Sequence, residues 1–457
     1  MRFYYTAEQI RAAEAPLLAA LPDGALMRRA ATGLATAIAG ELRRGTGAVA
    51  GRRICVVVGS GDNGGDGLWA ATLLRRRGVA ADAILLDPER THRSALTAFR
   101  DAAGRVVQTI RAGTDLVIDA VVGISGSGPL RPAAAEVFRA IEDAGIPVVA
   151  VDIPSGIDVA TGAINGPAVR AALTVTFGGL KPVHALADCG RVELVDIGLD
   201  LPNTDLVGFD AADVKAHWPM PGPHDDKYSQ GVVGILAGSA AYPGAAVLCT
   251  GAAVAATSGM VRYAGPAAAD VVSHWPEVVI APDASSAGRV QAWVVGPGLG
   301  TDEAALMALT FALKSDLPVV VDADGLTVLA AHPNLLTRRQ APTVLTPHAG
   351  EYARLAGAPP GATVLLKGNV TVIAGPDRVY LNPAGDSWAA TAGSGDVLSG
   401  IIGALLAAGL APGEAAAAAA FVHARAANAS AADPGPVSVP TSASRILTHI
   451  RRAIAEL

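Results

Sequence analysis

Gly393-Ser394-Gly395-Asp396 runs directly into the apolar stretch Val397 to Leu406, and this junction decides how the C-terminal half of the chain is interpreted. The stretch is compatible with a helix, which would place Asp396 at a helix N-terminus. Free backbone N–H groups at such a position attract anions, and the carboxylate could take a proton. The same string also fits a flexible turn closed by an N-capping aspartate, so the rest of the chain has to decide between the two.

A second glycine-rich junction lies far upstream. The apolar run Ile54 to Val58 predicts a buried strand, and it is followed by Gly59-Ser60-Gly61-Asp62-Asn63-Gly64-Gly65-Asp66-Gly67 and then by a helical apolar pattern. We expect Asp62 to Gly67 to form a loop whose unobstructed backbone N–H groups suit a diphosphate. Open α/β sheets bind ligands outside the carboxyl ends of their strands. Because each half of the chain carries such a junction, the sequence predicts two active sites.

Length and composition limit the possible classes of protein. At 457 residues the chain exceeds the usual domain of about 100 to 200 residues, which favours two large α/β domains. The formal net charge of -6 and the dispersed basic residues argue against a nucleic-acid partner. Three cysteines without metal-ligand spacing suit a reducing cytosol, and we expect a cytoplasmic protein with no export signal and no membrane span.

Short β-rich runs alternate with helical stretches along the first half. Residues 6–44 predict two helices, the first opened by a capping box at Thr6 to Gln9. The predicted strands that follow are Ile54–Val58, Ala83–Leu86, Leu116–Val122, Val148–Ile153 and Leu173–Phe177. This alternation predicts right-handed βαβ units and a parallel sheet.

A proline-rich segment separates the two halves, and we predict a first domain at 1–215, a linker at 216–223 and a second domain at 224–457. A new alternation begins at Gly231. Its last three predicted strands, near Val364, Val370 and Val379, are too close for intervening helices and predict a hairpin or meander. Two helices are expected in the alanine-rich tail.

Three strand ends of the first half carry polar residues that should share one crevice. Asn63 follows the first strand, Asp119 ends another, and Asp152 and Ser155 follow a third. An oxygen-only cage from Asn63, Asp119 and the Ser155 region would suit a weakly hydrated monovalent or a hard divalent cation better than zinc. The alternative is that each aspartate merely caps a turn.

These motifs resemble the NAD(P)H-hydrate epimerase family over residues 1–215. The likeness lies in G-x-G-x-N-G-G-D-G after a strand, D-A-x-x-G-x-x-G-x-G from Asp119, and D-I-P-S-G from Asp152. It implies a Rossmann-like (YjeF N-type) three-layer domain in which Asn63, Asp119 and Ser155 bind potassium and Asp152 contacts the hydrated nicotinamide. It further implies that the substrate is held by Asp62, Asn63, Gly64, Gly65, Asp66, Gly123, Ile124, Ser125, Gly126, Ser127, Gly128 and Pro129. Asp62 departs from the family, which commonly has Asn there.

Epimerisation of a hydrated nicotinamide inverts the carbon that bears the hydroxyl group. Ring opening and reclosure, or loss and return of water, would achieve this with an acid or base in place. Asp152 is the candidate for that catalytic role. A non-catalytic binding module is the alternative for this half of the chain.

The second half resembles the ADP- or ATP-dependent NAD(P)H-hydrate dehydratases, a branch of the ribokinase-like α/β fold, over residues 223–457. The likeness combines Gly393 to Asp396 with His224 to Gly231, Val295 to Gly300, Val321 to Leu326 and Leu345 to Glu351. It implies that the adenine nucleotide is held by Lys367, Gly368, Asn369, Val370, Thr371 and Gly395. It implies that the hydrate faces Ala245, Gly298, His348 and Asp396. Departures from the family occur at Asp386-Ser387-Trp388 and at Ala392.

The implied reaction makes chemical sense because hydroxide leaves a saturated ring poorly, whereas a phosphate ester leaves well. Asp396 would act as base while the nucleotide, with Mg²⁺ on its phosphates, donates a phosphoryl group. The expected partners are therefore the hydrates of NADH and NADPH and an adenine nucleotide, and we expect a homo-oligomer. The alternative for this half is a small-molecule kinase acting on a hydroxymethylpyrimidine or hydroxyethylthiazole.

Overall fold

The computed structural model describes residues 1–124, 126, 128–355, 357 and 361–457. The chain forms two compact units. The N-terminal unit comprises Phe3–Thr204, and the C-terminal unit comprises Met1–Arg2 together with Asp205–Leu457. This division differs from the predicted boundary at residue 215, because strand β9 (Leu206–Gly208) pairs with β18 (Val379–Pro383) of the C-terminal unit. The linker at 216–223 stays a prediction.

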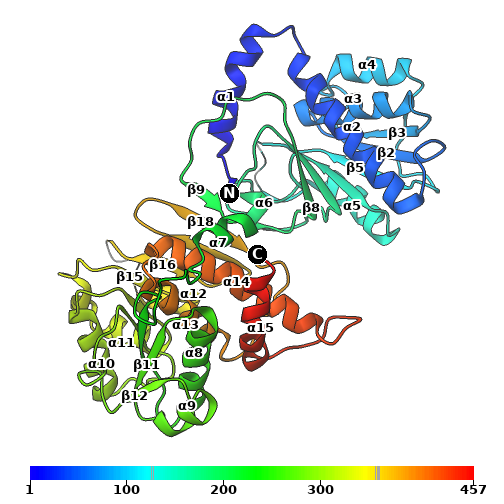
Figure 1. The fold of residues 1–457 in the computed structure, drawn as a ribbon. Helices are drawn as coiled ribbons and strands as arrows, with labels where there is room; N and C mark the ends of the chain where they lie inside the picture. Colours follow the sequence, from blue (N-terminus) through cyan, green and yellow to red (C-terminus); the bar gives the residue numbers. More distant parts are fainter. Residues whose placement is uncertain (125, 127, 356, 358–360) are drawn as a thin grey trace. The chain divides into compact units, whose positions relative to one another are not determined.

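The N-terminal unit contains a seven-stranded sheet of order β4-β3-β2-β5-β6-β7-β8, in which every pairing is parallel (Figure 1). The strands are β2 (Arg53–Val58), β3 (Ala80–Leu85), β4 (Arg105–Val106), β5 (Leu116–Ala120), β6 (Val148–Val151), β7 (Leu173–Phe177) and β8 (Arg191–Val195). All five strands predicted for this half are present. The half-exposed edge strand β8 lacks an apolar run and was not predicted.

Alternate side chains of β2 explain the layers of this unit. Ile54, Val56 and Val58 belong to a buried cluster with α2 (Ala25–Thr46), α3 (Asp62–Arg75) and α4 (Arg93–Asp101), whereas Cys55 and Val57 pack with α5 (Pro132–Asp143). Successive strand residues point to opposite faces, so an uninterrupted apolar strand is buried by helices on both sides. The result is the predicted three-layer α/β arrangement. The remaining helices are α1 (Ala7–Ala20), which begins with the predicted capping box, and α6 (Val183–Leu186).

The C-terminal unit is built on an eleven-stranded sheet of order β1-β9-β18-β17-β16-β15-β14-β13-β10-β11-β12. Its other strands are β1 (Arg2–Phe3), β10 (Val232–Leu236), β11 (Met260–Ala264), β12 (Val279–Ala281), β13 (Ala292–Val295), β14 (Val319–Val321), β15 (Thr343–Leu345), β16 (Thr363–Leu366) and β17 (Val370–Ala374). The pairings from β12 to β16 are parallel, and β17 runs antiparallel to both β16 and β18. The predicted meander is therefore confirmed.

Helices cover both faces of this sheet (Figure 1). One face packs on α8 (Pro243–Ala256), α13 (Ser394–Ala407), α14 (Pro412–Ala432) and α15 (Ala443–Ala455), and the other on α10 (Glu303–Lys314) and α11 (Asp324–Ala331). The shorter helices are α7 (Ala211–His217), α9 (Ala268–His274), the 3-10 turn Pro333–Leu336 and α12 (Ala349–Arg354). Alanine dominates α14 because small side chains let it pack closely on α13 and α15.

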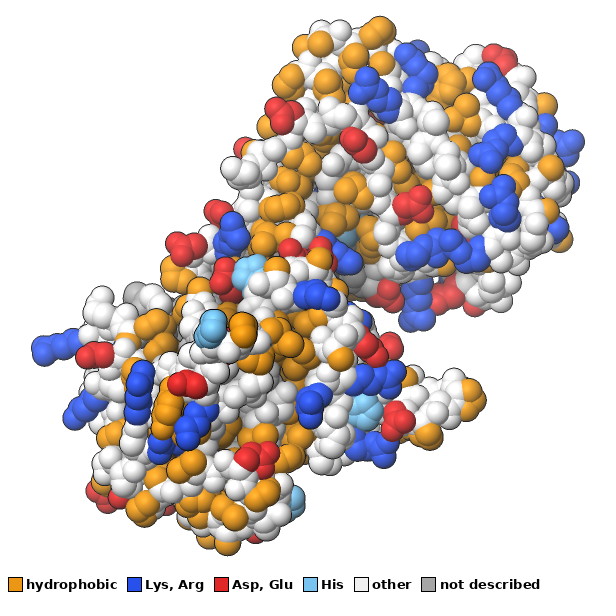
Figure 2. All heavy atoms as spheres, in the orientation of Figure 1, with side chains coloured by type: hydrophobic (Ala, Val, Ile, Leu, Met, Phe, Trp, Pro, Cys, Tyr) orange, Lys and Arg blue, Asp and Glu red, His pale blue; other side chains and the backbone are white. Residues whose placement is uncertain are grey.

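Three further features concern the surface, the cysteines and the apolarity of the helices. Hydrophobic, basic and acidic side chains are interspersed on the face of each unit that Figure 2 shows. Cys55, Cys189 and Cys249 are buried free thiols. Within the described residues, no helix combines the length and apolarity needed to cross a bilayer.

Candidate active sites

Three strand ends of the N-terminal unit bring Asn63, Asp119 and Ser155 together. Asn63, in the first turn of α3, donates from Nδ2 to the carbonyl oxygens of Val122 (2.9 Å) and Val151 (2.7 Å). Asp119 accepts from the Ser155 backbone N–H at 2.8 Å and from the Ser155 hydroxyl at 2.7 Å. The convergence expected from strand order is therefore present, and the aspartate also bonds neighbouring amides, as the turn-capping alternative foresaw.

This cluster is rich in oxygen atoms and fully buried at Asp119. Burial raises the pKa of Asp119 to about 6, although hydrogen bonds from Ser155 oppose the rise. A Cβ atom on Gly123 would lie 2.7 Å from Asn63 Oδ1, so glycine is needed for the strand end to approach the amide oxygen. In the described chain no three His, Cys, Asp or Glu side chains gather as a metal site. The donor set therefore suits a weakly hydrated cation held by amide, hydroxyl, carboxylate and carbonyl oxygens better than a transition metal.

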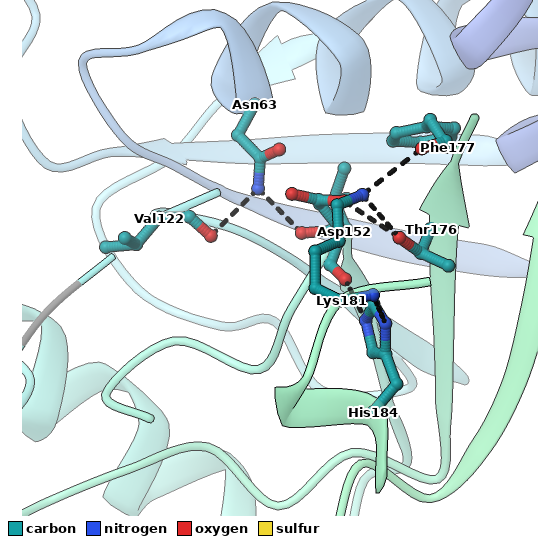
Figure 3. Close-up of polar contacts among 8 residues, drawn as sticks. Asn63, Val122, Asp152, Thr176, Phe177, Lys181 and His184 are labelled. Carbon is teal, nitrogen blue, oxygen red and sulfur yellow. Dashed lines mark hydrogen bonds and ion pairs between the residues drawn. The ribbon is translucent and has the colours of Figure 1, made fainter. Parts of the chain in front are cut away.

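Asp152 lies beside this cluster and is held by a buried lysine (Figure 3). Lys181 Nζ donates to Asp152 Oδ1 at 2.6 Å, and the Thr176 hydroxyl donates to the same oxygen at 2.9 Å. Burial works to raise the pKa of Asp152, but the charge and hydrogen bond of Lys181 outweigh it and leave the pKa lowered. Asp152 Oδ2 has no hydrogen-bond partner in the described part of the chain, so this oxygen is free to accept a hydrogen bond.

The backbone around Asp152 is fixed from two directions. Asp152 has φ +70, a left-handed conformation that aspartate tolerates better than most residues. His184 Nε2 lies 2.9 Å from the Asp152 carbonyl oxygen, and His184 Nδ1 accepts from the Lys181 backbone N–H at 2.9 Å. This pattern requires the neutral tautomer with hydrogen on Nε2. It agrees with a His184 pKa that burial, and then Lys181, lower to about 4.

Lys181 and His184 were not among the predicted site residues. The sequence offered only a lysine shortly after β7, at residue 181. The structure adds that this lysine is 1% exposed. Lysine is almost never so buried unless it is paired.

The segment Asp62–Gly67 is helical, which corrects the expectation of an open anion-binding loop. Helix α3 begins at Asp62, so only its first turn has backbone N–H groups free of the helix ladder. Gly64 and Gly67 serve close packing instead, because added Cβ atoms would lie 2.5 Å from the Gly59 carbonyl oxygen and 2.6 Å from Ala120 Cβ.

Asp66 shares a face of α3 with Asp62 and Asn63, four and three residues away. Its Oδ1 is buried with no partner among the described residues. Burial, followed by the charges of Asp152, Asp62 and Glu14, raises the pKa of Asp66 well above its usual range. The raised pKa favours the protonated form of Asp66, which can donate a hydrogen bond.

The loop after β5 holds the remaining predicted substrate residues. Gly126 N–H donates to the Gly123 carbonyl at 2.7 Å, which makes a tight turn beside Ile153. Ile124, Gly128 and Pro129 complete the described part of this loop. Ser125 and Ser127 lie outside the described residues.

In the C-terminal unit, Ser394–Asp396 forms the first turn of α13, as predicted. Gly393 precedes it with φ +83, which glycine adopts without strain. Burial, and then the charge of Asp322, raise the pKa of Asp396 to about 7. The Ser394 hydroxyl forms a hydrogen bond with His423 Nε2 at 3.2 Å. Burial lowers the pKa of His423 to about 4. Asp396 is thus a carboxyl group at a helix N-terminus with a pKa near neutrality.

A lysine–aspartate pair lies next to this turn, with Asp322 buried and Lys367 partly exposed. Lys367 Nζ donates to Asp322 Oδ1 at 2.7 Å, and the Ser399 hydroxyl donates to Asp322 Oδ2 at 2.7 Å. Burial opposes the charge of Lys367, but Asp322 outweighs it and leaves the pKa of Lys367 raised. Asp322 lies within the motif Val321 to Leu326, but the sequence assigns it no role.

A cavity of about 560 Å³ opens beside Lys367 and the first turn of α13. Its lining includes the predicted residues His348, Lys367, Gly368, Asn369, Thr371 and Gly395. Val370, the first residue of β17, does not line the cavity, although Asn369 and Thr371 on either side of it do. Asp386 and Ser387, from the segment that departs from the family, also line the cavity. Ser387 donates to Asn369 Oδ1 at 3.3 Å, and Trp388 Nε1 donates to Asp386 at 3.2 Å.

The other residues predicted to face the hydrate lie near neighbouring strand ends. A Cβ on Gly298, which has φ +59, would lie 2.6 Å from Ala245 Cβ, so these two residues are adjacent. His348 caps α12, where its Nδ1 accepts from the backbone N–H groups of Gly350 (3.0 Å) and Glu351 (3.3 Å). It therefore has a structural role, while its ring also lines the cavity.

Comparison with known proteins matches both units. Residues 23–183 match the family model described as YjeF-related protein N-terminus, and residues 233–449 match the one described as NAD(P)H-hydrate dehydratase. The bifunctional NAD(P)H-hydrate repair enzymes of Mycobacterium tuberculosis and Mycobacterium leprae are 74% and 71% identical, with 100% of each chain covered. Among solved structures, the ADP/ATP-dependent NAD(P)H-hydrate dehydratase of Bacillus subtilis is 26% identical and covers 56% of this chain and 99% of its own, with a TM-score of 0.48.

Proposed function

The chain belongs to the family of bifunctional NAD(P)H-hydrate repair enzymes, and from this premise we propose how its residues divide the work. The N-terminal unit interconverts the R and S hydrates of NADH and NADPH. The C-terminal unit dehydrates the S form and consumes ADP or ATP. The fusion is chemically sensible because the dehydratase can then draw on both epimers.

One observation carries this proposal: each unit has its own carboxylate beside a lysine at the ligand edge of its sheet. In the N-terminal unit this is Asp152 with Lys181, and in the C-terminal unit it is Asp396 beside Lys367 and Asp322. Two separate acid–base centres in one chain support two reactions. The small-molecule kinase is set aside, because the relatives matched over the whole chain are repair enzymes.

In the epimerase reaction, Asp152 Oδ2 would take the proton of the hydroxyl group on the ring. If the ring opens, the carbon–nitrogen bond breaks as a carbonyl forms, and the ring nitrogen gains a proton. Reclosure on the opposite face returns both protons and inverts the carbon. If water leaves instead, the hydroxyl group is protonated on departure, and the water that returns on the other face gives up a proton. Protonated Asp66 offers a donor for either route.

Potassium would be held in this unit by Asn63, Asp119 and Ser155. Their amide, carboxylate and hydroxyl oxygens fit such an ion. When bound, it would supply positive charge to a site rich in carboxylates. Asp62 and the first turn of α3, with the Gly123–Pro129 loop, would position the nucleotide part of the hydrate.

In the dehydratase reaction, Asp396 would remove the proton from the hydroxyl group of the hydrate, whose oxygen then takes the terminal phosphoryl group of the nucleotide. The phosphate ester leaves as phosphate with the electron pair of its carbon–oxygen bond, helped by electrons of the ring nitrogen. Loss of a ring proton restores the dihydronicotinamide. Ala245, Gly298 and His348 would position the hydrate for this step.

The cavity beside α13 would hold the adenine nucleotide. Lys367 and the first turn of α13, including Gly395, would hold its phosphates, and Gly368, Asn369, Val370 and Thr371 would contact the rest of it. Mg²⁺ on the phosphates would neutralise charge that develops during transfer. A cytoplasmic location and a homo-oligomeric state stay predictions from the sequence.

The test follows the absorbance of the dihydronicotinamide while the protein acts on mixed-epimer NADH hydrate with Mg²⁺ and either ADP or ATP. We expect recovery beyond the S fraction, faster than spontaneous epimerisation allows. The nucleotide that supports recovery identifies the phosphoryl donor. Unchanged hydrates would overturn the proposal, and a stable phosphorylated product would restore the kinase alternative.

A further inference from the structure

Asp322 joins three elements beneath the dehydratase site. It follows β14, receives Lys367 Nζ from the end of β16 at 2.7 Å, and receives the Ser399 hydroxyl from the second turn of α13 at 2.7 Å. The side chain is 1% exposed. Both carboxylate oxygens are thus engaged, which fixes the orientation of the group.

The backbone around Asp322 is built to hold it in place. Its N–H donates to the Val295 carbonyl at 3.1 Å, and its carbonyl accepts from Gly325 at 2.9 Å. Gly296, with φ +123, allows this approach, because a Cβ there would lie 2.0 Å from the Asp322 carbonyl oxygen. The next residue, Ala323, has φ +49 and ψ -120, a conformation rare for alanine. Strained backbone of this kind is found at functional sites.

The pair of Asp322 and Lys367 lies directly under the turn that presents Asp396. A Cβ built on Gly395 would be 3.2 Å from Lys367 Nζ and 3.7 Å from Asp322 Oδ2. Glycine at 395 therefore lets the lysine reach the helix N-terminus, where anions bind.

We propose that Asp322 is a positioning residue for the dehydratase reaction, which holds Lys367 at the first turn of α13 and places a negative charge beneath the turn that presents Asp396. This inference rests on the proposed function of the C-terminal unit. Asp322 is buried and does not line the cavity, so it would act through the other two residues. Without the negative charge of Asp322, Lys367 would lose its fixed position beside the phosphates of the nucleotide.

The charges that face Asp396 come from several elements. Burial is the largest cause of its raised pKa, the negative charges of Asp322 and Asp324 add to it, and Lys367 opposes it. Cys249 on α8 stays neutral, since burial raises its thiol pKa well above the usual range, and His423 on α14 is neutral as well. Glu351 acts on Lys367, whose pKa it helps to raise. Among the charged groups, Asp322 therefore has the largest effect on the pKa of Asp396.

The test is the pH profile of dehydration in the full-length protein carrying Asp322→Asn. We expect kcat with S-hydrate and saturating ADP or ATP to fall about 10- to 100-fold, as misplacement of one site group commonly costs. The acid limb should move to lower pH, because removing a negative neighbour makes Asp396 easier to ionise. Asp316→Asn is the matched control, since it removes the same charge from an exposed position before the opposite end of β14.

Asp322→Glu separates position from charge. It keeps the negative charge but displaces Lys367, so we expect a lower kcat with the acid limb near that of the wild type. Epimerisation by the N-terminal unit of each variant reports whether that part of the chain is intact, and thermal unfolding reports on the C-terminal unit.

A folded Asp322→Asn protein with an unmoved acid limb would overturn the inference, even if its rate fell, because a merely structural role predicts that result. If Asp322→Asn does not fold, wild-type kcat in Asp322→Glu would overturn it. Failure of the wild-type protein to dehydrate the hydrate would instead overturn the proposed function itself.

Discussion

Lys181 Nζ lies 2.6 Å from Asp152 Oδ1 in the interior of the N-terminal unit, and the two side chains are 2% and 7% exposed. A charge pair this deeply buried loses hydration on both sides, so each partner depends on the other. In the C-terminal unit, Lys367 makes a similar pair with Asp322, but the Lys367 side chain is 24% exposed. The roles differ, because Asp152 is itself the proposed base, whereas Asp322 is proposed to position Lys367 beside the proposed base Asp396.

Replacing Lys181 by methionine should destabilise the protein and stop epimerisation. The change leaves a buried carboxylate without its partner, a loss that typically costs about 3–5 kcal/mol in the free energy of unfolding. Urea unfolding and an epimerisation assay measure the two effects. Adding Asp152→Asn to the same chain should recover much of the stability, while epimerisation stays lost. Arg170→Met is the control because that side chain is 90% exposed. Equal stability of Lys181→Met and wild type would contradict the role of the pair.

Asp152→Asn alone should lower the rate of epimerisation by about 10²- to 10⁴-fold, the usual loss when a general acid or base is removed. Asparagine tolerates the positive φ of this position, so the backbone should be kept, which alanine would not ensure. Dehydration of pure S-hydrate should be unchanged. Epimerisation is measured by the approach of a single epimer to the R/S mixture, with exposed Asp143→Asn as the matched variant. Unaltered epimerisation would return the N-terminal unit to a binding module.

The sequence predicted the sheets well where periodicity is strong. The uniformly apolar run Ile54–Val58 and the closely spaced strands before Pro383 left few alternatives, and both are observed. Strands β11 and β12 were missed, because Met260–Ala264 and Val279–Ala281 are partly exposed and lie toward the edge of the sheet. Asp62–Gly67 was expected as a loop because glycine disfavours helices, but packing of α3 on the sheet overrides that propensity.

The site was predictable only as far as strand order carries information. Asn63, Asp119 and Ser155 each stand at a strand end, and parallel topology brings such ends together. Lys181 and Asp152 are 29 residues apart, and Lys367 and Asp322 are 45 apart, so no local spacing announces either pair. These partners are set by tertiary packing, which a single sequence does not reveal.

Gly123→Ala should raise the potassium concentration needed for epimerisation. Its Cβ would lie 2.7 Å from Asn63 Oδ1 and would push that oxygen away from Asp119 and Ser155. The measurement is the epimerisation rate against potassium concentration at constant ionic strength, with sodium as the replacing ion. Gly45→Ala is the control, because a Cβ there meets nothing within 4 Å. A wild-type rate that does not depend on potassium would contradict the proposed cation site.

Dehydration should lose activity as the pH falls through about 7, the raised pKa of Asp396 that burial and then the charge of Asp322 produce. The sign follows from its role as base: above this pKa the carboxylate is ionised and accepts the proton, and below it the site is already occupied by one. The profile of kcat/KM should therefore be flat at alkaline pH and fall tenfold per pH unit on the acid side. Asp396→Asn should lower the rate about 10²- to 10⁴-fold across the range, whereas exposed Asp377→Asn should not change it. An acid limb near pH 4, the ordinary range of a carboxyl group, would show that a group other than Asp396 serves as the base.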